Sequence, residues 1–165
     1  MGFKEGASGW MEILEATSPR MESGGQPSGK ADTRFGSLTL KGEEQVLWRG
    51  KNLLPASPGA RMAFVGHYEL GDVATGSDVV LVQTSTTGTC KHMLNLVAVS
   101  LKGVTVSERF GTCSDLFRVV RDFKSPVLTI HIAGNQTPAN PQSGSLRNRE
   151  TYQFKNGVLS KLASK

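Results

Sequence analysis

Apolar and polar side chains alternate with a period of two over many short segments of this chain, beginning at Phe35. In the segment 127–132, leucine or isoleucine occupies every second position, with threonine and histidine between them. This period matches the β-strand, whose successive side chains point to opposite faces. Helical periodicity is almost absent from the same region. The pattern predicts an all-β protein, an antiparallel sandwich or small barrel of eight or nine short strands.

Turn-forming residues set the expected strand boundaries. Asn156-Gly157 is the strongest hairpin signal, because both turn positions need a positive φ, and Lys102-Gly103 predicts a second tight turn. Residues 51–59 are expected to form a loop, since proline cannot donate to a ladder. The strands are expected at 37–40, 45–48, 61–70, 78–84, 92–101, 104–110, 116–123 and 127–132, with a last hairpin over 152–159.

The strand expected at 61–70 has a clear two-faced pattern. Strict alternation places its side chains in two sets: Met62, Phe64, Tyr68 and Leu70 on one face, and Arg61, His67 and Glu69 on the other. The next strand, 78–84, is apolar on both faces at its centre, which predicts a central position in a sheet.

Residues 1–34 have a different composition and are expected to form a flexible, poorly ordered tail or leader. Segment 23–30 is rich in Gly, Ser, Pro and Gln, as flexible linkers are. Within the tail, Trp10, Ile13 and Leu14 have near-helical spacing and predict a short helix over 9–16. The remainder, 35–165, is expected to be a single β-domain.

The bulk composition excludes several classes of protein. The chain has 165 residues, 38% of them hydrophobic, with 19 Lys and Arg against 14 Asp and Glu, a net charge of +5. No apolar run reaches the roughly 18 residues of a membrane span, and the chain as written has no signal peptide. A membrane bundle, a coiled coil and a two-domain enzyme are excluded. The excess of basic over acidic side chains is compatible with an anionic partner, either a protein or a polymer.

Cys90 and Cys113 are separated by 22 residues. If Leu101 faces Val104 across the turn, the two cysteines lie diagonally, two positions out of register. A β-bulge at Gly111 or in 87–89 would bring them together. We therefore expect a Cys90–Cys113 disulfide, which would place the protein in an oxidising compartment, periplasmic or secreted. Two reduced buried thiols, or a metal-binding or catalytic cysteine, are the alternatives.

Three motifs carry a resemblance to a known group of proteins. They are the strand 78–83, the pair GTC at 88–90 and FGTCSD at 110–115, and the closing pattern Tyr152-x-Phe154-x-Asn156-Gly157. Over roughly 78–160 the chain resembles small, largely uncharacterised proteobacterial envelope β-proteins with a paired-cysteine hairpin. The resemblance implies export and a disulfide, and supplies no activity.

No motif predicts catalytic, metal-binding or cofactor-binding residues. There is no Gly-x-Ser-x-Gly elbow and no phosphate-binding loop. His67, His92 and His131 are expected to be solvated or hydrogen-bonded. The acidic residues at turns and strand ends are expected to act as solubilising charges: Glu43, Glu44, Glu69, Asp72 and Asp78.

The long polar segment 134–149 is the candidate binding loop, because a structureless stretch of this length in a compact domain is often functional. Its candidate residues are Asn135, Gln136, Asn140, Arg147 and Arg149. The sequence favours a non-catalytic bacterial envelope β-domain that binds a protein or surface polymer through this loop, the loop at 51–60 or a sheet edge. One alternative is a basic β-barrel that binds nucleic acid or another polyanion. Another is an enzyme whose site is assembled from scattered strand residues.

Overall fold

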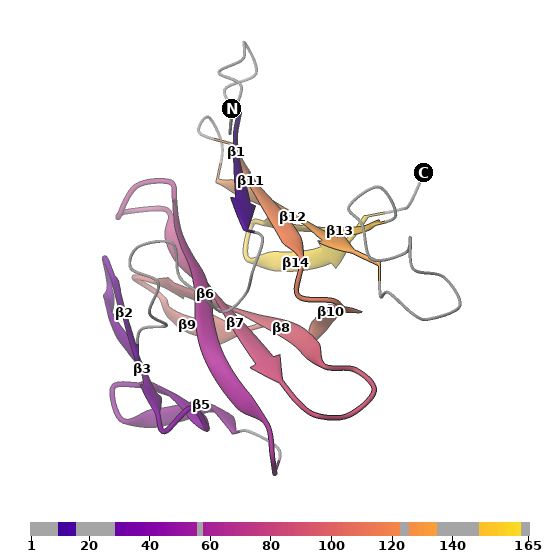
Figure 1. Cartoon of the computed structure of the whole chain (residues 1–165). Coiled ribbons are helices and arrows are strands. Elements are labelled where there is room, and N and C mark those ends of the chain that lie inside the picture. The colour runs from indigo at the N-terminus through magenta and orange to yellow at the C-terminus, as the bar shows by residue number, and fades with distance from the viewer. Residues whose placement is uncertain (1–9, 16–28, 56–57, 123–125, 135–148, 163–165) are drawn as a thin grey trace. The chain divides into compact units, whose positions relative to one another are not determined.

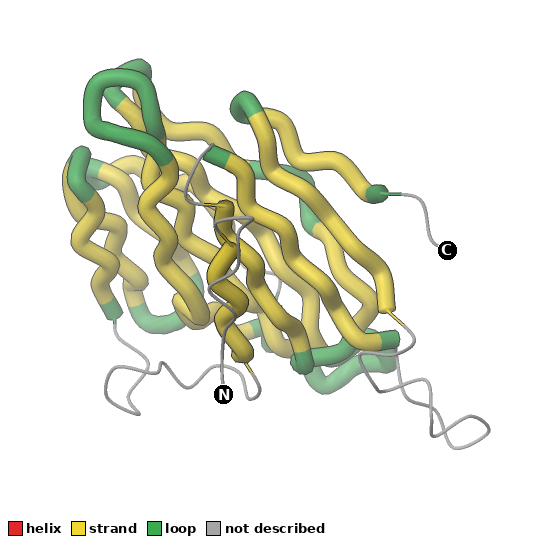
Figure 2. The backbone as a smooth tube through the Cα atoms, turned by 90° about the horizontal axis from the view of Figure 1, so that it is seen from above, coloured by secondary structure: helices red, strands yellow, loops and turns green. Residues whose placement is uncertain are grey.

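The structure, a computed structural model, describes residues 10–15, 29–55, 58–122, 126–134 and 149–162. Every element in this part of the chain is a β-strand (Figure 2), and the strands pair antiparallel in three sheets. The predicted all-β class is confirmed. The sheets have open strand orders, so the sandwich, rather than the barrel, describes them.

The strands divide between two compact units, residues 18–110 and residues 1–17 together with 111–165. Figure 1 labels most of them. Their bounds are β1 (Trp10–Glu15), β2 (Lys30–Thr33), β3 (Gly36–Lys41), β4 (Gln45–Trp48), β5 (Lys51–Pro55), β6 (Arg61–Leu70), β7 (Ser77–Ser85), β8 (His92–Ser100), β9 (Gly103–Val106), β10 (Phe110–Cys113), β11 (Phe117–Asp122), β12 (Val127–Ala133), β13 (Arg149–Lys155) and β14 (Val158–Lys161).

The unit 18–110 contains two packed sheets. One has the order β2-β3-β4-β5; in the other, β7 lies between β6 and β8, and β9 pairs with β8. Apolar side chains from both sheets form one core: Ala31, Leu38, Val46, Trp48, Met62, Phe64, Val80, Val82, Val97 and Val99. Gly36 makes room for the indole of Trp48, because a Cβ at Gly36 would lie 2.8 Å from a Trp48 ring carbon.

A bulge in β6 corrects the predicted faces of this strand. The register with β7 shifts between Phe64 and Gly66, so one residue is inserted into the alternation. After the bulge, His67 pairs with Val80, which lies on the core face with Met62 and Phe64. Strict alternation predicts His67 on the face opposite Met62 and Phe64. The bulge therefore turns the imidazole toward the core between the two sheets.

The other unit contains one five-stranded sheet of order β1-β11-β12-β13-β14. The cross-strand register assigns its side chains to two faces. One face carries the buried side chains Phe117, Val119, Leu128, Ile130, Ile132, Tyr152 and Phe154, together with Leu159 and the charged Arg121, Glu150 and Lys161. The opposite face, called here the polar face, carries the polar side chains Arg118, Thr129, His131, Arg149, Thr151, Gln153, Lys155 and Ser160, together with Val120, Val158 and the buried Val127 and Ala133.

Three predictions about the N-terminal half need correction. The backbone of Trp10–Glu15 is strand β1 rather than the helix expected at 9–16; six residues are too few to stabilise a helix alone, whereas β11 supplies a ladder. Residues Lys30–Thr33, expected in the tail, pair with β3. The expected loop at 51–59 begins as strand β5, an edge strand with Pro55 at its end, where proline is tolerated. Most of the expected tail lies outside the described residues.

Candidate functional site

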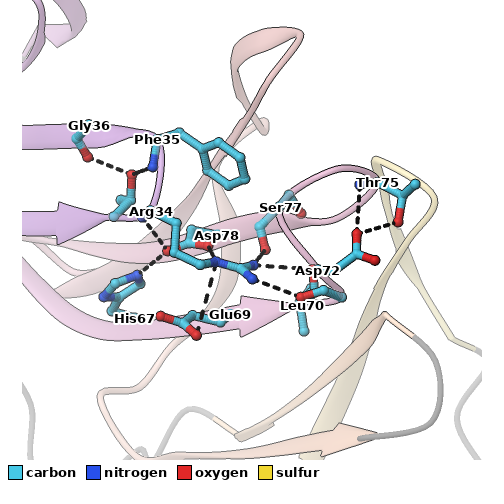
Figure 3. Close-up of polar contacts among 12 residues, drawn as sticks. Arg34, Phe35, Gly36, His67, Glu69, Leu70, Asp72, Thr75, Ser77 and Asp78 are labelled. Atoms are coloured by element: carbon cyan, nitrogen blue, oxygen red, sulfur yellow. Dashed lines mark hydrogen bonds and ion pairs between the residues drawn. The ribbon is translucent and has the colours of Figure 1, made fainter.

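The most polar interior site surrounds the carboxylate of Asp78, at the start of β7. Its side chain is 0% exposed. Oδ1 accepts a hydrogen bond from Arg34 Nε at 2.6 Å. Oδ2 accepts from the Arg34 backbone N–H at 3.0 Å and contacts His67 Nε2 at 2.8 Å. Figure 3 shows Arg34 and His67 meeting this carboxylate from different elements.

Arg34 lies in the turn between β2 and β3, in the other sheet of the same sandwich. Its guanidinium also donates to three backbone carbonyls at the β6–β7 end, those of Gly71 (2.8 Å), Ser77 (3.2 Å) and Leu70 (3.5 Å) (Figure 3). The Thr33 hydroxyl donates a hydrogen bond to the Gly36 carbonyl and so stabilises the turn that contains Arg34. Arg34 thus joins the two sheets of the sandwich.

Asp78 is ionised in this site. Burial by itself would raise the pKa of the Asp78 carboxyl, but hydrogen bonds from His67 and Arg34 outweigh burial and lower it below its ordinary value. The arrangement is therefore a buried, hydrogen-bonded ion pair, and we call Arg34, His67 and Asp78 the Arg34 clamp. The expectation that Asp78 is a solubilising charge is wrong, because packing of the two sheets encloses the strand end where it lies.

The contacts of the clamp link the two sheets of the sandwich. An Asp–His pair resembles part of a hydrolase triad, which also needs a nucleophile hydrogen-bonded to the histidine. Among the described residues, the His67 side chain pairs with Asp78 Oδ2, and no Ser, Thr or Cys side chain hydrogen-bonds to it. Nor do three His, Cys, Asp or Glu side chains gather there as metal ligands would. The other histidines have partners of their own, Ser85 for His92 (3.3 Å) and Thr151 for His131 (2.8 Å).

The disulfide between Cys90 and Cys113 is present, as predicted. The sequence predicts a turn at Lys102-Gly103, and with that turn only a β-bulge would bring the two cysteines together. The β8–β9 hairpin instead pairs Ser100 with Gly103, so the turn is Leu101-Lys102 and paired residue numbers sum to 203. The turn therefore lies one residue earlier in the chain than the sequence pattern predicts.

The predicted binding loop is largely outside the described residues, including Asn135, Gln136, Asn140 and Arg147. Of the candidate binding residues in this loop, Arg149 alone is described; it is exposed and is the first residue of β13. The candidate binding residues that the sequence does not reveal lie further along the chain, at β14.

The strand β14 is an edge of its sheet. Leu162 N–H donates to the Thr151 carbonyl at 2.8 Å. This bond shows which residues of β14 direct their backbone N–H and C=O groups toward β13 and which direct them outward. The backbone groups of Ser160 therefore point toward β13, whereas those of Leu159 and Lys161 point away from it. Within the described ranges, no strand pairs with this outer side.

Exposed apolar side chains accompany this open edge. The described residues expose four large hydrophobic side chains: Val73, Leu101, Val158 and Leu162. Val158 (62% exposed) is the first residue of β14, and Leu162 (37% exposed) directly follows its last residue. The other two lie in turns. The outer edge of β14 with Val158 and Leu162 is called the β14 edge below.

Charged groups surround the β14 edge. Lys161 Nζ lies 3.4 Å from Glu150 Oε2, and Glu150 Oε1 accepts a hydrogen bond from the Tyr152 hydroxyl at 2.8 Å. Burial, followed by the hydrogen bond and charge of Glu150, raises the pKa of Tyr152 to about 12. Lys155 and Arg149 are exposed on the polar face that Val158 shares.

The described residues thus form an all-β protein with a disulfide, an internal ion-pair clamp and, at β14, a sheet edge that exposes apolar side chains. No family model, curated protein or solved structure matches the chain. No helix among the described residues is long and apolar enough to cross a membrane.

Proposed function

We propose that this protein is a non-catalytic binding domain of an oxidising compartment, such as the bacterial envelope, and that it binds another protein through a sheet edge. The supporting observation is the β14 edge, where outward backbone groups and two exposed apolar side chains coincide. An edge strand of this kind is a template for another strand.

Two other edge strands among the described residues, β5 and β6, carry features that oppose strand addition. The edge strand β5 contains Pro55 and faces a register shift in β4. The edge strand β6 has the bulge after Phe64, and its Met62 N–H is occupied by the Glu43 carbonyl at 2.8 Å. Proline, bulges and covering turns are the usual means by which edges avoid pairing. The contrast supports β14 as the binding edge.

The charge distribution favours a protein over a polyanion. Several cations are already close to carboxylates: Lys30 to Asp32, Arg34 to Asp78, Arg61 to Glu43 and Lys161 to Glu150. Nucleic-acid binding instead needs many cations available to neutralise phosphates. The disulfide supports an oxidising compartment.

Site-specific photo-crosslinking tests this function. A photoreactive amino acid replaces Ser160 at the β14 edge or, as the control, Val73 in the β6–β7 turn, in cells that make the protein naturally. We expect a protein adduct from position 160, lost in the Val158→Ser/Leu162→Ser variant and retained in Leu101→Ser. Equal labelling from both positions, or no adduct at 160, contradicts the proposal.

A further inference from the structure

We infer that the Cys90–Cys113 disulfide is a reversible redox element: a dithiol reductant opens it while the protein stays folded, and an oxidant closes it again. This inference goes beyond the proposed function and does not depend on the β14 edge. It follows from the exposure of the two cysteines, from hydrogen bonds that stabilise each cysteine segment without the bridge, and from the backbone conformation of Cys113.

Neither cysteine of the bridge is buried. Cys90 and Cys113 are both partly exposed, and the residues on each side of Cys90, segment 87–89 and Lys91, are exposed. Thiol–disulfide exchange requires that a thiolate reach a bridge sulfur. A thiolate in solvent can approach this bridge from the side of segment 87–89 without unfolding of the protein, and the positive charge of Lys91 attracts it.

The segment that carries Cys90 is stabilised by its own hydrogen bonds. The Thr86 hydroxyl donates to the Cys90 carbonyl at 3.0 Å, and the Thr86 N–H donates to the Lys91 carbonyl at 2.9 Å. The Gly88 N–H donates to the Thr86 hydroxyl oxygen at 3.3 Å. None of these bonds involves a sulfur atom, so the segment keeps its conformation when the bridge opens.

The segment that carries Cys113 has a similar set of bonds. The Thr112 hydroxyl donates to the Ala133 carbonyl. The Ser114 N–H donates to the Thr112 hydroxyl oxygen at 3.4 Å, and the Leu116 N–H donates to the Ser114 hydroxyl oxygen at 3.1 Å. These bonds also persist without the bridge. Closure of the bridge therefore requires no refolding of either segment.

The backbone of Cys113 favours the open form. Cys113 has a φ of 75° and ends strand β10. The left-handed region is unfavourable for a residue with a β-carbon, and Asn and Asp tolerate it best. The other described non-glycine residues with positive φ lie in tight turns between strands: Glu43, Arg49 and Asn156. Opening the bridge removes one constraint on this strained backbone, and strained or exposed disulfides are the exchangeable ones.

The exchange transfers two electrons from the reductant to the bridge. A thiolate of the dithiol forms a bond to one bridge sulfur, the bond between the two cysteine sulfurs breaks, and its electron pair leaves on the other cysteine as a thiolate. The second thiol of the reductant, as a thiolate, then attacks the reductant sulfur of the mixed disulfide and releases the second cysteine thiolate. The products are an oxidised reductant and two cysteine thiols, which take up their protons from water.

Reduction of the oxidised full-length chain by dithiothreitol tests the accessibility of the bridge. Free thiols are alkylated at intervals and counted by intact mass. We expect a rate within about tenfold of the rate for the urea-unfolded chain, unchanged by urea below the unfolding transition, and a circular dichroism spectrum that reduction does not alter. A rate that follows the unfolding transition, or loss of the spectrum on reduction, overturns the inference.

A matched pair of variants tests the closure of the bridge. Thr86→Val removes the hydroxyl that bonds the Cys90 carbonyl and the Gly88 N–H, whereas Thr89→Val changes an exposed threonine of the same segment. With oxidised glutathione as the oxidant, we expect the reduced Thr86→Val chain to close about fivefold more slowly than the wild type, and Thr89→Val to close at the wild-type rate. Equal closure rates for the two variants overturn the role of the segment in reversibility.

Discussion

Removal of the Arg34 side chain should destabilise the unit 18–110 more than removal of any exposed cation in it. Arg34→Ala leaves Asp78, which is 0% exposed, without its 2.6 Å hydrogen bond from Arg34 Nε. Loss of one partner of a buried ion pair costs about 3–5 kcal/mol. Arg34 itself is 20% exposed, so we expect the lower end, about 3 kcal/mol in the free energy of unfolding.

The magnitude is tested against an exposed ion pair of the same unit. Arg61 and Glu43 lie 3.8 Å apart, with side chains 78% and 59% exposed. Arg61→Ala should cost less than about 1 kcal/mol, as exposed pairs do. The loss of unfolding free energy in Arg34→Lys should fall between the losses in Arg61→Ala and Arg34→Ala, because an ammonium group cannot reproduce the several guanidinium contacts.

Urea unfolding followed by tryptophan fluorescence measures these differences. Trp48 lies in the core of the sandwich, and a Trp10→Phe background makes it the only tryptophan of the chain, which has two. A loss for Arg34→Ala below about 1 kcal/mol, or no larger than the loss for Arg61→Ala, would refute the clamp as a stabilising element.

Three further outcomes follow from the structure. Cys90→Ser/Cys113→Ser should lower the free energy of unfolding by about 3 kcal/mol, as calorimetry or urea titration without reductant would measure, because the bridge restricts the unfolded chain; no change contradicts this role. Gln83 is 1% exposed, and neither of its amide atoms has a hydrogen-bond partner, so Gln83→Met should raise the free energy of unfolding by about 1–2 kcal/mol; a loss would show that the amide is satisfied in solution. The pKa of Asp78 is lowered in the folded state, so its contribution is present above the unfolded pKa near 3.8 and is lost as pH falls through the folded pKa; the difference between the wild type and Asp78→Asn in unfolding free energy should shrink between about pH 5 and pH 2, and a constant difference contradicts the ion pair.

Local patterns were sufficient to predict the fold class and several strands. The expected strand 61–70 coincides with β6, and the Asn156-Gly157 turn joins β13 to β14 with φ of 53° and 79°. These features depend on side-chain alternation and backbone conformation at single positions. Both are properties of neighbouring residues, so the sequence displays them directly.

Long-range features were not predictable in the same way. The bulge in β6 turns His67 to the face opposite the one expected. No sequence pattern predicts this bulge. Arg34 and Asp78 are 44 residues apart, and only packing of two sheets brings them together. One signal was available: Asp78 directly precedes the apolar run 79–82, and a charge in such a place requires a partner.

The β14 edge was missed for a related reason. The sequence predicts a strand at Val158-Leu159, but it does not show which strands have a neighbour on each side. Edge position is set by the order of all five strands in the sheet. The preference for the loop 134–149 rested on its composition, which carries no information about strand order.

Amide hydrogen exchange of β14, resolved by residue with NMR in the oxidised protein, tests the central claim most directly. An open edge predicts an alternation: Ser160 and Leu162 amides protected by β13, and Leu159 and Lys161 amides exchanging rapidly with solvent. Protection of all four amides would show that the edge is already occupied, and rapid exchange of all four would show that β14 is not a strand. Either result would contradict the account.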